Sequence, residues 1–184
     1  MTTEASRPPP TEASLHEAAL NYLARYATTE SGLRQVLFRR IDLWARQAAE
    51  RDDAQERAAE AKTAVPKIIA RLVALGLLND AAFAENRAKT LALGGRSRRA
   101  IAARLFAKGI DPEQARAVLP DDEGVSALIL CRKRRIGPFR TTAGADRNKE
   151  LGVLARAGFP RDVAVQVLAM ETDAAEAAIR VARE

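Results

Sequence analysis

Residues 65–119 hold the strongest constraint on the fold, because they contain short amphipathic segments separated by glycine. The first segment has apolar residues at the i, i+3, i+4, i+7 spacing that places them on one face of a helix. These residues are Val65, Ile68, Ile69, Leu72 and Val73. Pro66 suits the first turn of such a helix, where its missing N–H is not needed. Gly76 can adopt the left-handed conformation that ends a helix, so the pattern predicts a helix between Val65 and Gly76.

Two further helices are predicted in the same segment. Asp80 is placed to cap the second helix and Gly94-Gly95 to end it. Ser97 and Gly109 have the same roles for the third helix, and Asp111 starts another short one. The residues that we expect to be buried are Phe83, Ala84, Ala88, Leu91, Ile101, Leu105 and Phe106.

The N-terminal part of the chain also has a helical pattern. Ser14 begins a capping-box motif, and Thr28-Thr29 separates the helix that follows from a second one. The second helix has its apolar residues on one face: Leu33, Val36, Leu37, Ile41, Trp44 and Ala45. Residues 48–64 are helix formers of mixed charge, so we expect a long solvated helix that breaks near Asp52-Asp53 and leads into the helix at Val65.

The C-terminal part repeats the alternation of caps and glycines. Asp121-Asp122-Glu123 suits a helix N-terminus, and the predicted helix over 124–135 buries Val125, Leu128, Ile129 and Cys131. A loop is predicted over 139–145. The remaining predicted helices are 146–157, one that starts near Pro160 and Asp162, and 174–183 with Asp173 as its cap.

An internal repeat supports one architecture. Residues 98–110 align with 148–159, so that Gly109 matches Gly158 and Leu105 matches Leu154 at a period of 49 residues. No segment shows the sustained apolar–polar alternation of a strand. We therefore predict an all-α protein of tandem three-helix repeats, stacked into an elongated, curved array because each unit needs neighbours to cover its apolar faces. The expected divisions are a flexible tail over 1–13, a first repeat with a long charged helix over 14–78, a second repeat over 79–120, and a third repeat with an added C-terminal helix over 121–184.

The sequence contains no recognisable enzyme signature. It lacks the glycine-rich phosphate loops of nucleotide-binding enzymes, and its only histidine is His16. One histidine and one cysteine, Cys131, cannot build a catalytic triad or a histidine-rich metal site. We expect His16 to be a solvated helix residue and Cys131 a packed core thiol. The sequence therefore favours a protein that is not an enzyme and has no cofactor or metal. Its single cysteine, together with the absence of an apolar membrane span or leader, fits the reducing cytosol.

Charge is distributed unevenly along the chain. Residues 1–86 hold 11 Lys/Arg and 12 Asp/Glu, a net charge of −1. Residues 87–161 hold 17 and 7, a net charge of +10, and residues 162–184 hold 2 and 5, a net charge of −3. A basic middle segment suggests a polyanionic partner. The simpler interpretation is a solvated face in an arginine-rich chain.

Three basic clusters are the candidate binding residues. The first is Arg96, Arg98, Arg99, Arg104 and Lys108; the second is Arg132, Lys133, Arg134, Arg135 and Arg140; the third is Arg147, Lys149, Arg156 and Arg161. Arginine forks suit phosphate oxygens and carboxylates. The alternative for the second cluster is a helix C-terminus, where cations complement the helix dipole. Only Phe139 lies inside a basic cluster, in a loop that we expect to be exposed, which argues against a dedicated single-strand binder with stacking platforms.

Three segments carry a family resemblance. They are GLLNDAAFA (76–84), GRSRRAIAARLFAKGI (95–110) and DPEQARAVL (111–119), and together they resemble the middle repeat of the RecX regulatory family. Residues 153–168 resemble the third repeat of that family, and Ala18–Trp44 resembles the first repeat more loosely. The resemblance covers roughly residues 15–170.

The resemblance implies a function. RecX proteins are helical arrays that lie in the groove of a RecA–DNA filament and usually restrain its ATP turnover and strand exchange in DNA repair and recombination. It therefore implies a regulator of the RecA filament that touches DNA phosphates weakly in a salt-sensitive way, acts as a monomer in the cytoplasm and needs no membrane. Two alternatives stay open: a stand-alone helical nucleic-acid-binding module, and a helical scaffold for an unrelated acidic protein.

Overall fold

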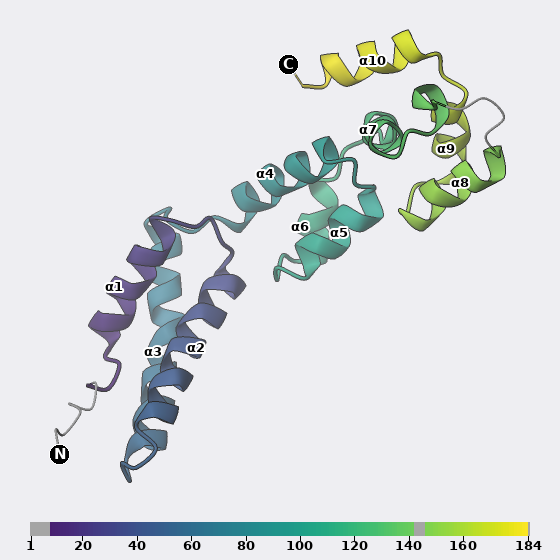
Figure 1. The fold of residues 1–184 in the computed structure, drawn as a ribbon. Helices are drawn as coiled ribbons and strands as arrows, with labels where there is room; N and C mark the ends of the chain where they lie inside the picture. Colours follow the sequence, from purple (N-terminus) through teal and green to yellow (C-terminus); the bar gives the residue numbers. More distant parts are fainter. Residues whose placement is uncertain (1–7, 142–145, 184) are drawn as a thin grey trace. The chain divides into compact units, whose positions relative to one another are not determined.

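The computed structural model describes residues 8–141 and 146–183, and in these ranges the chain contains helices and no strand (Figure 1). The all-α prediction is therefore confirmed. The chain divides into two compact units, Met1–Phe83 and Ala84–Glu184. The boundaries that the sequence suggests for three repeats stay a prediction. The parts of the expected tail and loop that fall on residues 1–7 and 142–145 lie outside the described residues, as does Glu184.

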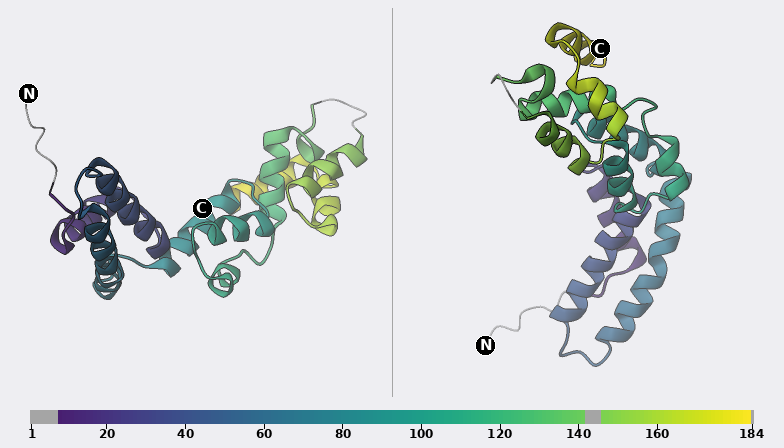
Figure 2. Two further views of the ribbon diagram at one scale, coloured as in Figure 1. Left: turned by 90° about the horizontal axis from the view of Figure 1, so that it is seen from below. Right: turned by 90° about the vertical axis from the view of Figure 1, so that its right-hand side faces the viewer.

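The first unit is built from α1 (Glu12–Leu23), α2 (Glu30–Gln47) and α3 (Ala54–Ala74). Helices α2 and α3 run side by side as an antiparallel hairpin, which is visible in the right-hand view of Figure 2, and α1 packs against them. The predicted face of α2 is confirmed at Leu33, Leu37, Ile41, Trp44 and Ala45, which are all buried. The core of this unit is therefore the seam between three amphipathic helices.

The inner face of α3 corrects one prediction. Residues 48–64 were expected to form a solvated helix, yet Ala54, Ala58 and Ala61 are buried against the rest of the unit. Alanine side chains at this spacing lie on one helix face and let two helix backbones approach closely. The mixed charges of this segment occupy the remaining faces, so the charge pattern hid the apolar stripe.

The break near Asp52-Asp53 is confirmed, since α2 ends at Gln47 and α3 begins at Ala54. The Asp53 carboxylate accepts from Arg57 Nε at 2.6 Å and from Arg51 Nε at 3.2 Å. These hydrogen bonds, first to Arg57 and then to Arg51, lower the pKa of Asp53. The turn is thus held by one carboxylate between two arginines.

The sequence suggested that Pro66 lies in the first turn of a helix, but it lies inside α3. A proline within a helix removes one backbone hydrogen bond and costs about 3 kcal/mol. Burial of Val65, Ile68, Ile69 and Leu72 on the C-terminal half of the same helix offsets that cost. Local propensity therefore predicted a helix start near Val65, whereas tertiary packing keeps α3 continuous through Pro66.

Several predicted caps are displaced by a few residues. Thr11, and not Ser14, caps α1, because Thr11 Oγ1 accepts from the Ser14 N–H while Ser14 Oγ accepts from the Thr11 N–H. Asn79 accepts from the Ala82 N–H at 2.9 Å at the start of α4 (Asp80–Leu93). Asp80 instead accepts from the Glu30 N–H at 2.9 Å. The last helix, α10 (Thr172–Val181), begins before the predicted cap Asp173.

The second unit contains the rest of α4 and the helices that follow. They are α5 (Arg98–Phe106), α6 (Pro112–Ala117), α7 (Gly124–Arg134), the 3-10 turn η1 (Gly137–Phe139), α8 (Arg147–Arg156) and α9 (Arg161–Leu168), ahead of α10. Helix α7 contacts α9, α10 and η1, and its buried residues include Leu128, Ile129 and Cys131. Val125 is only partly buried, whereas Ser126 and Ala127 are buried. The C-terminal core is therefore organised around α7.

The repeat predicted from the sequence has a local structural counterpart. Leu105 and Leu154 are both fully buried, and Gly109 and Gly158 both have positive φ angles, of 81° and 90°. A positive φ disfavours residues with a Cβ, so glycine ends α5 and α8 in the same way. The two aligned segments thus share a helix, a glycine stop and a buried leucine.

Phe106 contradicts its predicted burial. Ile101 and Leu105 are fully buried on α5, but 65% of Phe106 is exposed. Adjacent helix residues point about 100° apart, so Leu105 and Phe106 cannot both face the same core. The apolar pair allowed either residue to be buried, and the packing of α5 selects Leu105.

Candidate functional site

The candidate basic residues lie on helices of the second unit and in the connections beside them. Arg96 is in the α4–α5 connection; Arg98, Arg99 and Arg104 are on α5, and Lys108 follows it; Arg132, Lys133 and Arg134 end α7; Arg147, Lys149 and Arg156 are on α8. Arg135 is the C-cap of α7, Arg140 follows η1, and Arg161 begins α9. All are exposed except Arg132, which is partly buried.

The connection between α4 and α5 brings the three clusters to one place. Lys133 Nζ donates to the Gly94 carbonyl at 2.7 Å, and Ser97 Oγ donates to the Ala157 carbonyl at 2.7 Å. A Cβ at Gly95 would lie 3.0 Å from the backbone nitrogen of Leu130, so this loop lies directly on α7. We call residues Gly94–Arg99, with the end of α7 and the Ala157–Gly158 corner, the basic junction.

Arg99 connects the first cluster to the third. Its Cβ and Cδ lie 3.6 Å from where a Cβ would stand on Gly158, so its aliphatic stem passes over that glycine. Arg156 lies in the last turn of α8, two residues before Gly158. The basic junction therefore carries Arg96, Arg99, Lys133 and Arg156, which come from all three clusters.

Ser97 is the residue that fixes the basic junction. Its hydroxyl accepts from the Ala100 N–H at 3.3 Å as the N-cap of α5, while it donates to Ala157. We expect Ser97→Ala to lower the free energy of unfolding of the second unit by about 1.5 kcal/mol, since both the helix cap and the hydrogen bond to the partly buried Ala157 carbonyl are lost. Urea unfolding followed by far-UV circular dichroism measures this.

Asp111→Ala is the matched control for Ser97→Ala. Asp111 caps α6 by accepting from the Glu113 N–H at 2.8 Å, at an exposed site without a long-range partner. Its loss should cost about 1 kcal/mol or less. An effect of Ser97→Ala no greater than that of Asp111→Ala would show that the bond to Ala157 contributes nothing.

Glu123 explains how two arginines are tolerated at the start of α5. Cations oppose the dipole at a helix N-terminus. The Glu123 side chain is buried, and its Oε1 accepts from the Arg98 N–H, while Arg98 Nη1 donates to the Asp121 carbonyl at 3.4 Å. The sequence suggested that Glu123 serves the following helix, whereas Asp122 has that role by accepting from the Gly124 N–H at 2.8 Å.

The second cluster is partly used inside the fold. Arg132 Nη1 lies 3.1 Å from Glu176 Oε2, and Arg140 Nη2 lies 2.7 Å from Glu150 Oε2. Arg134 and Arg135 are exposed at the end of α7. Arg135 has a φ of 55°, and it is the non-glycine residue with positive φ within the described ranges. Arginine in that conformation costs about 1–2 kcal/mol relative to glycine, which argues for a role of its side chain.

The third cluster has one weak internal pair. Lys149 Nζ lies 3.9 Å from Asp146 Oδ2, and its side chain is largely exposed. Arg156 lies against its own helix, with Nη1 3.2 Å from where a Cβ would stand on Gly152. Arg147 and Arg161 are at the first positions of α8 and α9. These side chains remain at the surface and can accommodate an external anion.

Phe139 does not lie in an exposed loop. It is partly buried and packs against the C-terminal core in η1. Phe106 is instead the exposed ring beside basic residues, and sequence reasoning assigned it to the core. His16 also differs from its expectation, because it is partly buried and its Nε2 has no hydrogen-bond partner among the described residues.

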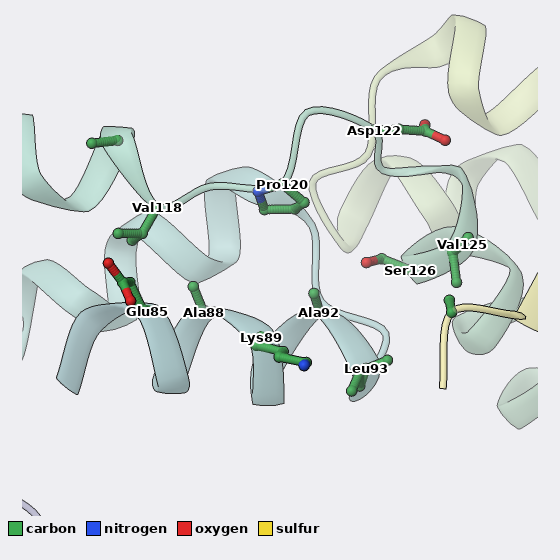
Figure 3. Close-up of a pocket in the computed structure, with 12 residues that line it drawn as sticks. Glu85, Ala88, Lys89, Ala92, Leu93, Val118, Pro120, Asp122, Val125 and Ser126 are labelled. Carbon is green, nitrogen blue, oxygen red and sulfur yellow. The ribbon is translucent and has the colours of Figure 1, made fainter. Parts of the chain in front are cut away.

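A pocket of about 470 Å³ lies between α4 and the α6–α7 connection (Figure 3). Its lining is largely apolar and includes Ala88, Ala92, Val118 and Pro120. Glu85, Lys89 and Asp122 are the charged residues along it. Glu85 and Lys89 come from α4, and Asp122 comes from the α6–α7 connection.

Two further kinds of group bear on the chemistry of the site, the thiol and the side chains that could bind a metal. Burial raises the pKa of the Cys131 thiol to about 12, so this cysteine is a protonated, packed core residue, as predicted. Over residues 8–141 and 146–183, no group of three or more His, Cys, Asp or Glu side chains could hold a metal ion. No helix in those ranges is long and apolar enough to cross a membrane.

The middle of the chain matches a protein-family model. The family model described as "RecX, second three-helix domain" matches residues 79–119. The chain is similar to a regulatory protein RecX of Myxococcus xanthus, with 41% identity over 162 residues that cover 84% of this chain and 83% of that protein. It is also similar to a regulatory protein RecX of Mycobacterium leprae, with 32% identity over 178 residues, 93% of this chain and 94% of the relative.

A solved structure has the same fold. The crystal structure of RecX from Lactobacillus salivarius superposes with a TM-score of 0.58 at 22% identity, over 92% of this chain and 97% of the other. At that identity the likeness concerns the fold alone. The two sequence relatives also show the family, because this chain is at least 32% identical to each and covers more than four fifths of their length. On this basis the chain belongs to the RecX family of regulatory proteins.

Proposed function

We propose that this chain binds RecA–DNA filaments in the filament groove and restrains their ATP hydrolysis and strand exchange. The observation that carries the proposal is the 41% identity to a regulatory protein RecX over most of both chains. The RecA–DNA filament is proposed as the partner because of the family that the sequence resembles. The exposure of the basic side chains in the second unit supports the proposal.

The electrostatics of the second unit support a polyanionic partner. Residues 87–161 carry a net charge of +10, from 17 Lys/Arg and 7 Asp/Glu, and the basic junction gathers Arg96, Arg99 and Arg156 within this segment. Arginine forks bind phosphate and carboxylate oxygens through paired, charge-assisted hydrogen bonds. A filament that presents both DNA phosphates and acidic side chains matches this surface.

The test is RecA-dependent ATP hydrolysis on single-stranded DNA, measured with increasing amounts of the protein. We expect the hydrolysis rate to fall as the protein approaches the RecA concentration. Electron microscopy of the same mixtures should show added density in the filament groove. An unchanged rate at stoichiometric amounts, with bare filaments in the images, would end the proposal.

A stand-alone nucleic-acid-binding module is the second candidate. Helices α4 and α5 are short and joined by Gly94-Gly95, and α5 exposes Arg99 and Arg104, so the pair has the parts of a helix-turn-helix unit. A mobility-shift titration on duplex DNA without RecA separates the two candidates. Tight, sequence-selective binding favours the module, whereas weak and salt-sensitive binding agrees with the filament regulator.

The proposal includes three further statements about the protein's state. It acts without catalysis of its own, because it works by occupying the partner. It acts as a monomer in the cytoplasm, where the RecA filament forms. Sedimentation of the isolated protein tests the monomeric state, and a mass of twice 20.0 kDa would contradict it.

A further inference from the structure

Phe106 is a large aromatic side chain with no place in the core. It ends α5, and 65% of it is exposed. Single exposed apolar residues are common, so exposure alone carries no function. Other exposed apolar residues, such as Tyr26, Leu75 and Leu77, lie within residues 1–86, where the net charge is −1. Phe106 differs because it lies in the basic segment.

Phe106 shares a helix face with Arg99. The two are seven residues apart, which brings their directions to within about 20° of each other after two helical turns. Exposed Ala103 lies between them on the same face, and the buried residues Ile101 and Leu105 face the other way. The outer face of α5 therefore presents an arginine, a small residue and an aromatic ring in one line.

The surroundings of this line favour an anion with flat apolar groups. Helix α5 has no acidic residue, and Arg99 lies at the Gly158 corner beside the helix end that carries Arg156. Two carboxylates lie near the ends of this helix and both are engaged: buried Glu123 accepts from the Arg98 N–H, and Asp111 caps α6. Arginines bind phosphates, and an exposed ring on a basic surface stacks on unpaired bases.

We infer that the outer face of α5 is a contact site for single-stranded nucleic acid, with Phe106 stacking on a base while Arg99 binds the neighbouring phosphates. This inference rests on the proposed function, because the strand in question is the one inside the filament. A single strand fits better than a duplex, since bases in a duplex are already stacked. An acidic protein surface would use the arginines but has no general need for the ring.

The experiment measures binding of the full chain to fluorescent oligothymidylate, and to an abasic oligomer of equal length, by fluorescence anisotropy without RecA. The oligomers carry the same phosphates, and only the first has bases. We expect Phe106→Ala to weaken binding of oligothymidylate about fivefold to tenfold and to leave the abasic oligomer unaffected. Phe106→Trp should retain binding, because it keeps an aromatic face.

Salt dependence separates the ring from the arginine. Arg99→Gln keeps the stem over Gly158 and removes the charge. It should lower the slope of log affinity against log salt by about 0.7 on both oligomers. Phe106→Ala should leave that slope unchanged. Tyr26→Ala is the control for loss of an exposed aromatic ring outside the basic segment and should change neither quantity.

Two results would overturn the inference. One is that Phe106→Ala binds oligothymidylate as the wild type does, or loses affinity equally for the abasic oligomer. The other is that it weakens capture of DNA-free RecA while oligothymidylate binding is unchanged, which would assign the ring to a protein surface. The binding assay contains no RecA, so it is independent of the proposed function. If binding of oligothymidylate depends on Phe106 while the wild-type protein leaves RecA-dependent ATP hydrolysis unchanged, the proposed function is contradicted and the single-strand site remains.

Discussion

Replacement of Glu150 by alanine should lower the free energy of unfolding of the second unit by about 3 kcal/mol. Glu150 is buried on α8 although it carries a carboxylate. Its Oε1 accepts from the Gly137 N–H at 3.2 Å, and its Oε2 lies 2.7 Å from Arg140 Nη2. Alanine would leave a buried N–H without a partner and Arg140 without its counter-charge.

Glu150 is important because it fixes the turn at Gly137–Arg140 that follows α7. Gly137 has a φ of 57°, and a Cβ there would lie 2.8 Å from Leu168 Cδ2, so this turn packs tightly on α9. The carboxylate holds the same turn from the other side. The Arg140 side chain is 40% exposed, so solvent screens part of the ion pair, and the expected cost is at the low end for breaking a buried pair.

Two probes separate the units in this measurement. Trp44, the only tryptophan, is buried in the first unit, so its fluorescence reports on that unit, whereas far-UV circular dichroism reports on both. The circular dichroism transition of Glu150→Ala in urea should move to lower concentration. If the transition followed by Trp44 fluorescence moves to the same urea concentration, the two units unfold together. The expected loss of unfolding free energy in Glu150→Ala is the same in that case.

Neighbouring substitutions provide controls for Glu150→Ala. Lys149→Ala removes a largely exposed residue whose ion pair is 3.9 Å long, and it should change stability by about 0.5 kcal/mol or less. Glu150→Gln retains a carbonyl oxygen for the Gly137 N–H and should have an intermediate effect. A Glu150→Ala transition that coincides with that of Lys149→Ala would contradict the structural role of the carboxylate.

Signals that act over a few residues were predictable from the sequence. Thr29, Ser97, Asp111 and Asp146 cap the helices after them, and glycines with positive φ follow α3, α5 and α8. Each of these effects depends on backbone groups within about four residues. The same short-range rules predicted the helix positions. They also predicted the buried face of α2 and the buried face of the C-terminal half of α3.

Contacts between distant residues were not predictable in this way. Ser97 and Ala157 are 60 positions apart, and Glu123 and Arg98 are 25 apart, so no local pattern links them. The candidate site was found as three separate runs of basic residues. Only the fold shows that the segments that carry Arg96, Arg99, Lys133 and Arg156 contact one another at the basic junction. It also shows that Arg132 and Arg140 are engaged by Glu176 and Glu150.

Loss of the three arginines of the basic junction should weaken filament binding about a hundredfold. The variant is Arg96→Gln, Arg99→Gln and Arg156→Gln together, which keeps side-chain volume and removes three exposed charges. Each lost charge-assisted contact is expected to cost about 1 kcal/mol, and about 3 kcal/mol corresponds to roughly two powers of ten in affinity. The concentration that halves RecA-dependent ATP hydrolysis should rise by the same factor.

Salt dependence and a charge-matched control decide whether this loss is specific. Where all three arginines contact phosphates, the slope of log affinity against log salt should fall by about 2. Arg34→Gln, Arg39→Gln and Arg46→Gln remove the same charge from exposed positions of α2, outside the basic segment. That control should retain affinity within about threefold, because an exposed charge that does not touch the filament is screened over about 10 Å. Equal losses in both triple variants would mean that net charge alone drives binding, and would remove the basic junction as a site.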